Sequence, residues 1–222
     1  MIHIPEIKLL SILNNLIDYT RNDTSNGSIR QEETLLYRYF FGQKVGDWDY
    51  YEKAVEMFKR KKSHPRYLEV RPYFDTERAS IPTIHLTMPS DRPISDGIGV
   101  DEGYQENYFD EGTNRITPTL TRTFEAQHQI IISSDNYSEV SMLYSYVKAV
   151  LISTLAEIDL DGLQNPRLGG QDLMIRDALV PKNIFYKAIT ITSNHEFHVP
   201  KLLSQPLLRN LILSGKPIST VQ

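Results

Sequence analysis

The segment 119–132 most constrains the fold, because its residues alternate with the two-residue period of a β-strand. One parity carries Leu120, Phe124, Ala126, His128, Ile130 and Ile132, and the other carries Thr119, Thr121, Thr123, Glu125, Gln127 and Gln129. Such a strand has an apolar side that another layer must cover and a polar side that water can reach. The chain is therefore expected to build its core on one face of a β-sheet.

Helical periodicity occurs on both sides of this strand. In 5–19, leucine and isoleucine recur at the spacing of an amphipathic helix. Asp47 is a suitable N-cap for a second helix over 48–62. Asn136 followed by Glu139 resembles a capping box, which predicts a third helix over 136–157 that packs against the sheet.

Other segments also show strand-like alternation, namely 68–70, 83–88 and 185–192, with a short candidate at 173–175. The predicted fold class is α+β, with a mostly antiparallel or mixed sheet of about four to five strands packed by two to three helices. We expect a single domain over 1–199, which includes a long acidic inter-strand loop over 89–118, and a C-terminal arm over 200–222.

Composition narrows the class of protein. Hydrophobic residues make up 40% of the chain and charged residues 23%, which is typical of a folded domain. The absence of cysteine excludes disulfides, thiolate metal sites and thiol nucleophiles. The net charge of −4 argues against attraction of the whole surface to nucleic acid. Residues 1–19 lack the pattern of a signal peptide or a membrane span, so neither export nor membrane insertion is expected.

One acidic stretch has part of the spacing of a calcium loop. Glu157, Asp159, Asp161 and Gly162 occupy relative positions one, three, five and six of such a loop. The position that should hold a bidentate glutamate is Leu168. A turn that ends a helix is the preferred interpretation.

The histidines do not form a recognisable metal motif. His195 and His198 are three residues apart, whereas the helical zinc-protease motif needs a spacing of four, so a surface turn is expected there. His85 lies on the polar parity of its strand and His128 on the apolar parity, so the two are not expected to converge. His128 is expected to be a hydrogen-bonded core residue.

Phosphate-binding and nuclease motifs also fail at required positions. Gly215 is followed by Lys216 and Pro217, but the earlier glycine and the magnesium-binding hydroxyl of a P-loop are missing. Gly169–Gly170 lacks the third glycine of a dinucleotide site. The glutamate-x-lysine pair formed by Glu6 and Lys8 falls on the first helix, not on a strand. We therefore expect no catalytic residue, no cofactor and no metal.

A basic cluster follows the second predicted helix. It comprises Lys59, Arg60, Lys61, Lys62, Arg66 and Arg71. Such a cluster could neutralise phosphates. The preferred interpretation is a solvated helix end that interacts favourably with the helix dipole.

The long loop combines negative charge with aromatic residues. There is no lysine or arginine between Arg92 and Arg115. Aromatic residues are enriched at protein interfaces and are unusual in a purely flexible acidic linker. We predict that this loop contacts another chain through Asp101, Glu102, Tyr104, Glu106, Tyr108, Phe109, Asp110 and Glu111.

The C-terminal arm is rich in leucine and interrupted by proline. Its leucines need to be covered, and the prolines at 200, 206 and 217 disfavour a long helix. We expect the arm to dock on a neighbouring subunit, or alternatively on its own sheet. The residues assigned to this contact are Leu202, Leu203, Leu207, Leu208 and Leu211.

The order of predicted elements resembles that of the tail terminator and neck ring proteins of tailed bacteriophages. The stretches that carry the resemblance are 81–89, 120–134, 135–155 and 181–192. In that family the sheet and helices form the body of a ring, loops and arms contact neighbouring proteins, and no residue is catalytic.

The resemblance implies a virion structural protein that is assembled in the host cytoplasm. It would form a homo-oligomeric ring at the head-tail junction or tail end and contact virion proteins such as the portal, the connector or the tail tube. DNA would pass through its lumen without sequence-specific contacts. Two alternatives stay open at this point: a divergent metal-dependent nuclease or other hydrolase, and a monomeric adaptor.

Overall fold

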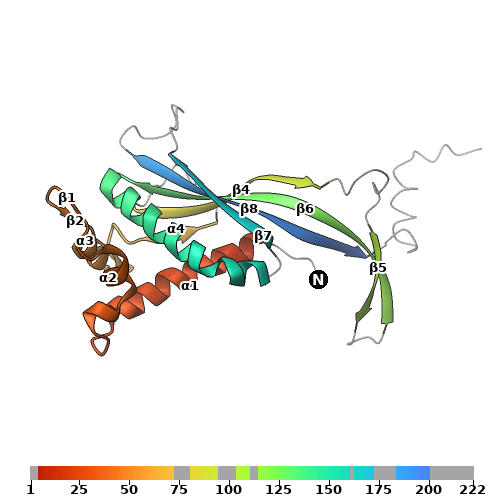
Figure 1. The fold of residues 1–222 in the computed structure, drawn as a ribbon, viewed down its shortest axis with the longest axis horizontal. Helices are drawn as coiled ribbons and strands as arrows, with labels where there is room; N and C mark the ends of the chain where they lie inside the picture. Colours follow the sequence, from red (N-terminus) through yellow and green to blue (C-terminus); the bar gives the residue numbers. More distant parts are fainter. Residues whose placement is uncertain are drawn as a thin grey trace, which may run out of the picture. The chain divides into compact units, whose positions relative to one another are not determined.

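Helices and strands occur together in a mixed α+β fold, which confirms the predicted class (Figure 1). The computed structural model describes residues 5–72, 81–94, 104–110, 115–160, 163–172 and 184–200. The α-helices within these ranges are α1 (Pro5–Ser25), α2 (Leu35–Phe40), α3 (Tyr50–Phe58) and α4 (Tyr137–Leu160). A 3-10 turn, η1 (Gln31–Glu33), precedes α2.

The strands form a small hairpin and a larger mixed sheet. The hairpin pairs β1 (Lys44–Val45) with β2 (Trp48–Asp49). The larger sheet has the order β3-β4-β6-β8-β7, and β5 pairs separately with β6. Its strands are β3 (Glu69–Arg71), β4 (Thr83–Pro93), β5 (Tyr104–Asp110), β6 (Arg115–Ser134), β7 (Gln164–Asp172) and β8 (Phe185–Pro200).

Contacts divide the chain into two compact units. The larger unit comprises Ile4–Arg92 and Glu125–His195, and the smaller comprises Met1–His3, Pro93–Phe124 and Glu196–Gln222. In the described part of the smaller unit, β5 pairs antiparallel with the beginning of β6, from Tyr104 opposite Thr121 to Asp110 opposite Arg115. The larger unit contains all four α-helices and most of the sheet.

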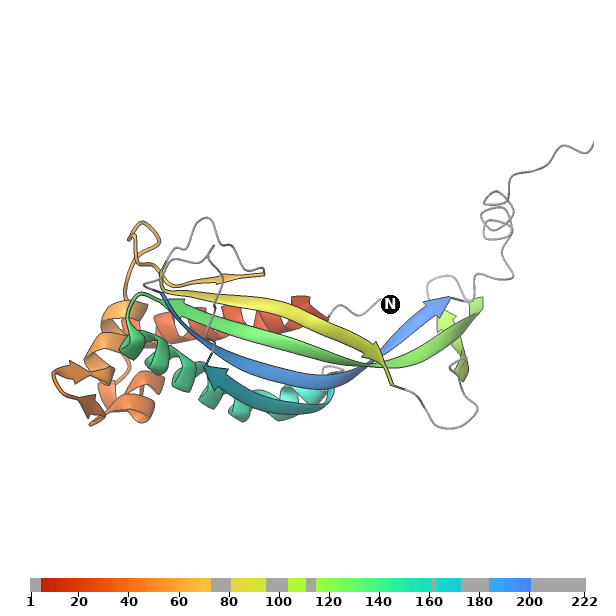
Figure 2. The ribbon, with the colours of Figure 1, turned by 90° about the horizontal axis from the view of Figure 1, so that it is seen from above.

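In the larger unit, α1 and α4 cover one face of the sheet (Figures 1 and 2). Helix α1 packs near β3 and α4 packs against β7. The even positions of β6 from Ala126 to Ile132 are fully buried, as the alternation predicts, and isoleucines of β8 continue the same core. From α1, Leu9, Leu13, Leu16 and Ile17 enter this core, in agreement with the predicted apolar stripe.

Tyr146 of α4 contacts each of the other α-helices. Its ring centroid lies 5.7 Å from that of Tyr39 and 6.0 Å from that of Phe40, both in α2, and 5.6 Å from that of Phe58 in α3. Its hydroxyl forms a 2.5 Å hydrogen bond with Thr20 Oγ1 of α1. Burial raises the pKa of Tyr146, so the hydroxyl stays protonated. This side chain therefore joins the helices into one layer.

The N-terminus of α4 is fixed by a polar network. Asn136 accepts hydrogen bonds from the backbone N–H groups of Ser138 at 2.9 Å and Glu139 at 3.3 Å, which confirms the predicted cap. The buried carboxylate of Glu139 does not complete a capping box. It accepts hydrogen bonds from Ser134 Oγ and, at 2.6 Å, from Arg66 Nη2.

Two predicted segments were wrong in their extent. The helix expected over 48–62 begins at Tyr50, because Asp49 rather than Asp47 accepts the capping hydrogen bond from Glu52 N–H, and it ends at Phe58. The loop expected over 89–118 contains the end of β4, all of β5 and the beginning of β6. Backbone pairing across a hairpin therefore uses much of a stretch whose polar composition had indicated a loop.

Two further predictions concern the end of the sheet. Strand β7 was not predicted, since it contains Pro166 and two glycines; a register shift between Gln164 and Arg167 accommodates the proline. Strand β8 runs beyond the predicted 185–192, so His195 is 3% exposed within a strand and does not lie in a surface turn. The candidate strand 173–175 and the arm 201–222 lie outside the described residues.

The contacts of Tyr146 predict two distinct losses of stability. Tyr146→Phe removes one buried hydrogen bond and should lower the free energy of unfolding by about 1 kcal/mol. Tyr146→Ala leaves a cavity among three helices and should cost about 3–5 kcal/mol. Urea unfolding followed by circular dichroism measures both; equal midpoints for the alanine variant and the unmodified chain would contradict this role.

Adjacent glycines in β7 provide a matched pair of substitutions. A Cβ atom at Gly170 would lie 1.8 Å from the Tyr144 hydroxyl of α4, whereas one at Gly169 would meet only Thr190 Cβ at 3.9 Å. Gly170→Ala should therefore force Tyr144 to move and destabilise the protein by about 1–3 kcal/mol. Gly169→Ala should change the melting temperature little, and a similar melting temperature for both variants would refute the predicted clash.

Candidate functional site

The three arginines of the predicted basic cluster form ion pairs with carboxylates of the same chain. Arginine side chains form the ion pairs Arg60–Glu56 at 3.1 Å, Arg66–Asp135 at 2.7 Å, Arg66–Glu139 at 2.6 Å and Arg71–Glu69 at 2.8 Å. The hydrogen bond from Arg66 lowers the pKa of Asp135. Lys59, Lys61 and Lys62 remain exposed at the surface. The arginines thus stabilise the fold, and the lysines supply most of the surface charge of this cluster.

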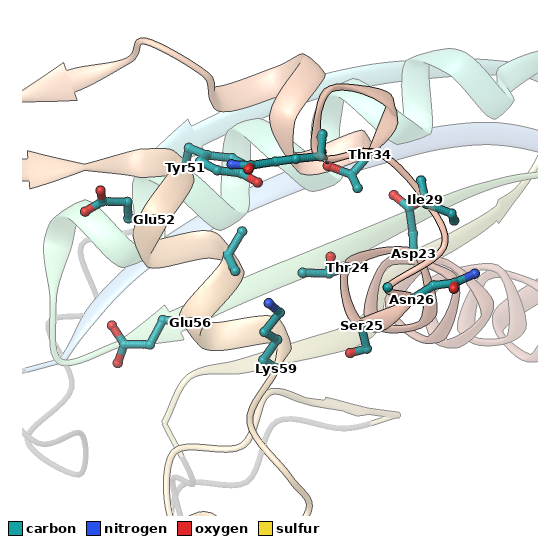
Figure 3. A pocket seen from close by; sticks show the side chains of 13 residues that line it. Asp23, Thr24, Ser25, Asn26, Ile29, Thr34, Tyr51, Glu52, Glu56 and Lys59 are labelled. Carbon is teal, nitrogen blue, oxygen red and sulfur yellow. Dashed lines mark hydrogen bonds between the residues drawn. The ribbon is translucent and has the colours of Figure 1, made fainter.

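A groove of about 520 Å³ lies between the C-terminal end of α1 and α3 (Figure 3). Asp23, Thr24, Ser25 and Asn26 line it from the α1 side, and Tyr51, Glu52, Glu56 and Lys59 line it from α3. Carboxylates outnumber the single lysine among these side chains. Its charge therefore suits a cationic group, such as a basic side chain, better than a phosphate.

Two carboxylates of this groove, Asp23 and Glu56, already have structural roles. Asp23 Oδ2 accepts a 2.7 Å hydrogen bond from the Leu35 N–H at the start of α2. Glu56 accepts hydrogen bonds from Lys53 at 3.0 Å and from Arg60 at 3.1 Å, and these bonds lower its pKa. A ligand that bound Asp23 or Glu56 would therefore compete with hydrogen bonds of the fold.

A second polar groove, of about 310 Å³, lies on the sheet. Ser90 and Arg92 come from β4, Glu125 and Gln127 from β6, Arg167 from β7 and Thr192 from β8. Glu125 and Gln127 have the opposite parity to the buried residues Ala126 and His128, so this groove faces away from the helices. It is termed the arginine groove below.

A buried polar cluster lies on the helix-covered face of the sheet. His128 is 0% exposed, and neither of its ring nitrogens has a hydrogen-bond partner in the described part of the chain; the same holds for Ser193 Oγ. Ser193 and His195 have the same parity in β8 as the core residues Ile189 and Ile191. The expected burial of His128 is confirmed, but the expected hydrogen bond is not found among the described residues.

The environment of His128 disfavours its charged form. Burial lowers its pKa, and His195 of β8 lowers it further, whereas the carboxylates of Glu6 in α1 and Asp91 in β4 act in the opposite direction. Burial is the largest of these effects. The imidazole is therefore held neutral inside the core.

The predicted interface residues are placed only in part. Tyr104, Glu106, Tyr108, Phe109 and Asp110 belong to β5, where Glu106 pairs with Thr119 of β6. The structure does not describe Asp101, Glu102 or Glu111, nor the arm residues Leu202, Leu203, Leu207, Leu208 and Leu211. The assignment of these residues to an interface stays a prediction.

Comparisons with known proteins add no family. No family model matches the chain, and no curated protein matches it at a significant level. Within the described residues, no group of three or more histidine, aspartate or glutamate side chains is arranged to hold a metal ion. No helix in those ranges is long and apolar enough to cross a membrane.

Sequence reasoning missed the arginine groove, because its charged residues come from three strands. Arg92 and Arg167 are 75 positions apart, and only the strand order brings both to Glu125. A partial signal was present in β6, where Glu125 is the one charged residue on its parity between positions 117 and 129, the others being threonine and glutamine. A lone carboxylate on the polar side of a strand indicates a cross-strand partner.

The buried His128 predicts a loss of stability in acid. Its folded-state pKa is lowered, so between that value and the unfolded value of about 6.5 the unfolded chain binds more protons. Above this pH window, His128 does not lower the free energy of unfolding. As the pH drops through the window, the free energy of unfolding falls by at most about 1.4 kcal/mol per pH unit for one proton. Urea midpoints measured from pH 8 to pH 5 test this.

His128→Leu provides the comparison for that titration. Leucine removes the proton uptake and the unpartnered ring nitrogens, so the variant should lose less stability between pH 8 and pH 5 than the unmodified chain. The difference between the two pH profiles isolates the contribution of this imidazole. Parallel profiles would show that His128 does not cause the acid sensitivity.

Proposed function

We propose that this chain is a virion structural protein that forms a ring at the head-tail junction or tail end of a tailed bacteriophage, as a tail terminator or neck component. The observation that carries the proposal is the separate small unit around β5, whose sequence mixes carboxylates with aromatic residues. A strand pair of this composition suits a contact with another protein. DNA passes through the lumen of the ring in this proposal.

A closed ring requires two different complementary surfaces on each subunit. The β5 hairpin is proposed as one of them. The end of α2 and the β1–β2 hairpin that follows offer a second kind of surface, since Phe41, the C-cap of α2, is 62% exposed and Val45 of β1 is 63% exposed. The Phe41 ring stacks on Tyr37 at 4.1 Å, which keeps it in a defined position. Exposed apolar residues held in this way are typical of protein contact sites.

Two further parts of the chain are proposed to contact neighbouring proteins. The arm 200–222 reaches a neighbouring copy, and the ring body contacts virion proteins such as the portal, the connector or the tail tube. A structural role is supported by the larger unit, where the helices and the sheet share one core that gives the β1–β2 hairpin a packed base. Assembly takes place in the host cytoplasm.

Replacing residues 96–114 with a short glycine-serine linker tests the proposal. The larger unit keeps its helices and core, so the variant should fold, but it should lose assembly because the proposed contact is gone. Size-exclusion chromatography with light scattering measures the mass of each protein. The unmodified chain should give a ring-sized oligomer, alone or with virion partners, and the variant a monomer.

Circular dichroism provides the control for folding of the linker variant. A variant that assembles like the unmodified chain would show that 96–114 is not an interface. A chain that stays monomeric with every virion partner supplied would overturn the ring itself. Metal-dependent hydrolysis by such a monomer would instead favour an enzyme.

A further inference from the structure

We propose that the arginine groove binds carboxylates of the acidic segment 101–111 of a second copy of this chain, and that this contact joins neighbouring subunits. The inference rests on the proposed ring function and names the surface that receives the β5 hairpin. It makes the contact heterologous, since one copy supplies the groove and the next supplies the acidic segment.

The groove holds an excess of positive charge. Glu125 Oε2 accepts hydrogen bonds from Arg92, through Nε at 2.8 Å and also through Nη2, and Glu125 Oε1 accepts one from Arg167 Nη2 at 3.2 Å. Two guanidinium groups thus share one carboxylate, which leaves one positive charge unbalanced. The other lining residues, Ser90, Gln127 and Thr192, are neutral hydrogen-bonding groups.

The guanidinium groups are accessible to a partner. The Arg92 and Arg167 side chains are 74% and 69% exposed, whereas that of Glu125 is 20% exposed. Each guanidinium carries five N–H donors, and Glu125 uses only some of them. Exposed ion pairs of this kind contribute little to stability, so the arginines can reorient towards an incoming carboxylate at little cost.

The acidic segment has the complementary chemistry. It contains Asp101, Glu102, Glu106, Asp110 and Glu111, and no lysine or arginine lies between Arg92 and Arg115 in the sequence. In the β5–β6 pairing Arg115 lies opposite Asp110, whereas Glu106 lies opposite the neutral Thr119. Arginine and carboxylate groups form bidentate hydrogen bonds that fix the orientation of the partners as well as attracting them. A second copy therefore supplies the anion that the groove lacks.

A carboxylate partner agrees better with the charges than DNA does. Binding to DNA relies on the neutralisation of several phosphates, and the groove offers one net positive charge on a chain whose net charge is −4. A short acidic segment needs only one or two such contacts. DNA binding by the groove is accordingly an outcome of the test that would overturn the proposal.

Charge reversal on both sides of the contact provides the test. Arg92→Glu/Arg167→Glu should lose the oligomer because the groove then repels the acidic segment, and Glu106→Lys/Asp110→Lys should lose it for the reciprocal reason. The quadruple variant, with both changes in one chain, should recover assembly, as should a mixture of the two double variants. Light scattering after size exclusion measures the mass in each case.

Two controls separate charge from folding. Lys61→Glu/Lys62→Glu changes the net charge by the same amount as the groove variant, at exposed positions outside the groove, and should assemble normally. Arg92→Gln/Arg167→Gln removes the positive charge without adding a negative one and should weaken assembly less than Arg92→Glu/Arg167→Glu. Circular dichroism checks that each variant is folded.

The outcomes distinguish this inference from the ring proposal. If the unmodified chain assembles and the groove variants assemble equally well, the groove is not the contact, although the ring stands. If the unmodified chain is monomeric under every condition, both proposals fail. If the quadruple variant recovers assembly but the mixture of double variants does not, the contact lies within one chain. If the groove variant Arg92→Glu/Arg167→Glu assembles normally but loses the retention on double-stranded DNA that the unmodified chain shows, the groove is a phosphate site. Either result overturns the inference.

Discussion

The packing of Tyr146 is the interaction on which the helical layer depends. Helices α2 and α3 have six and nine residues, too few to be stable alone in water. They hold their positions because the Tyr146 ring lies among Phe40, Phe58 and their neighbours, and because its hydroxyl binds α1. The β1–β2 hairpin lies between these two short helices, so its exposed residues are positioned through the same contact.

A second constraint acts where α4 begins. The buried Glu139 carboxylate brings together Ser134 at the end of β6 and Arg66 from the segment after α3. An ionised carboxylate at low exposure requires such partners, because its desolvation is costly. The sequence around residues 59–71 is basic partly for this internal reason, which explains how an acidic protein can contain a basic cluster without using all of it at the surface.

The sequence predicted elements whose signal is local and periodic. The alternation of β6 and the cap at Asn136 depend on neighbouring residues, and both were found where expected. Strand β7 was missed because proline and glycine hide its period, and it forms through pairing with β8 and packing under Tyr144. The arginine groove was missed for a related reason: Arg92, Glu125 and Arg167 meet only after the strands have been ordered.

The strand order has a consequence for synthesis of the protein. Strand β8 follows β7 in the chain but lies between β6 and β7 in the sheet. A nascent chain that stops before residue 185 therefore leaves one edge of β6 uncovered, although β4 still pairs with the other, and leaves β7 without its pairing partner β8. Since unpaired strand edges promote aggregation, incomplete chains of this kind are expected to aggregate more readily than the full chain. Because β8 is synthesised after β7 but lies inside the sheet, the chain can complete this sheet only after β8 has been translated.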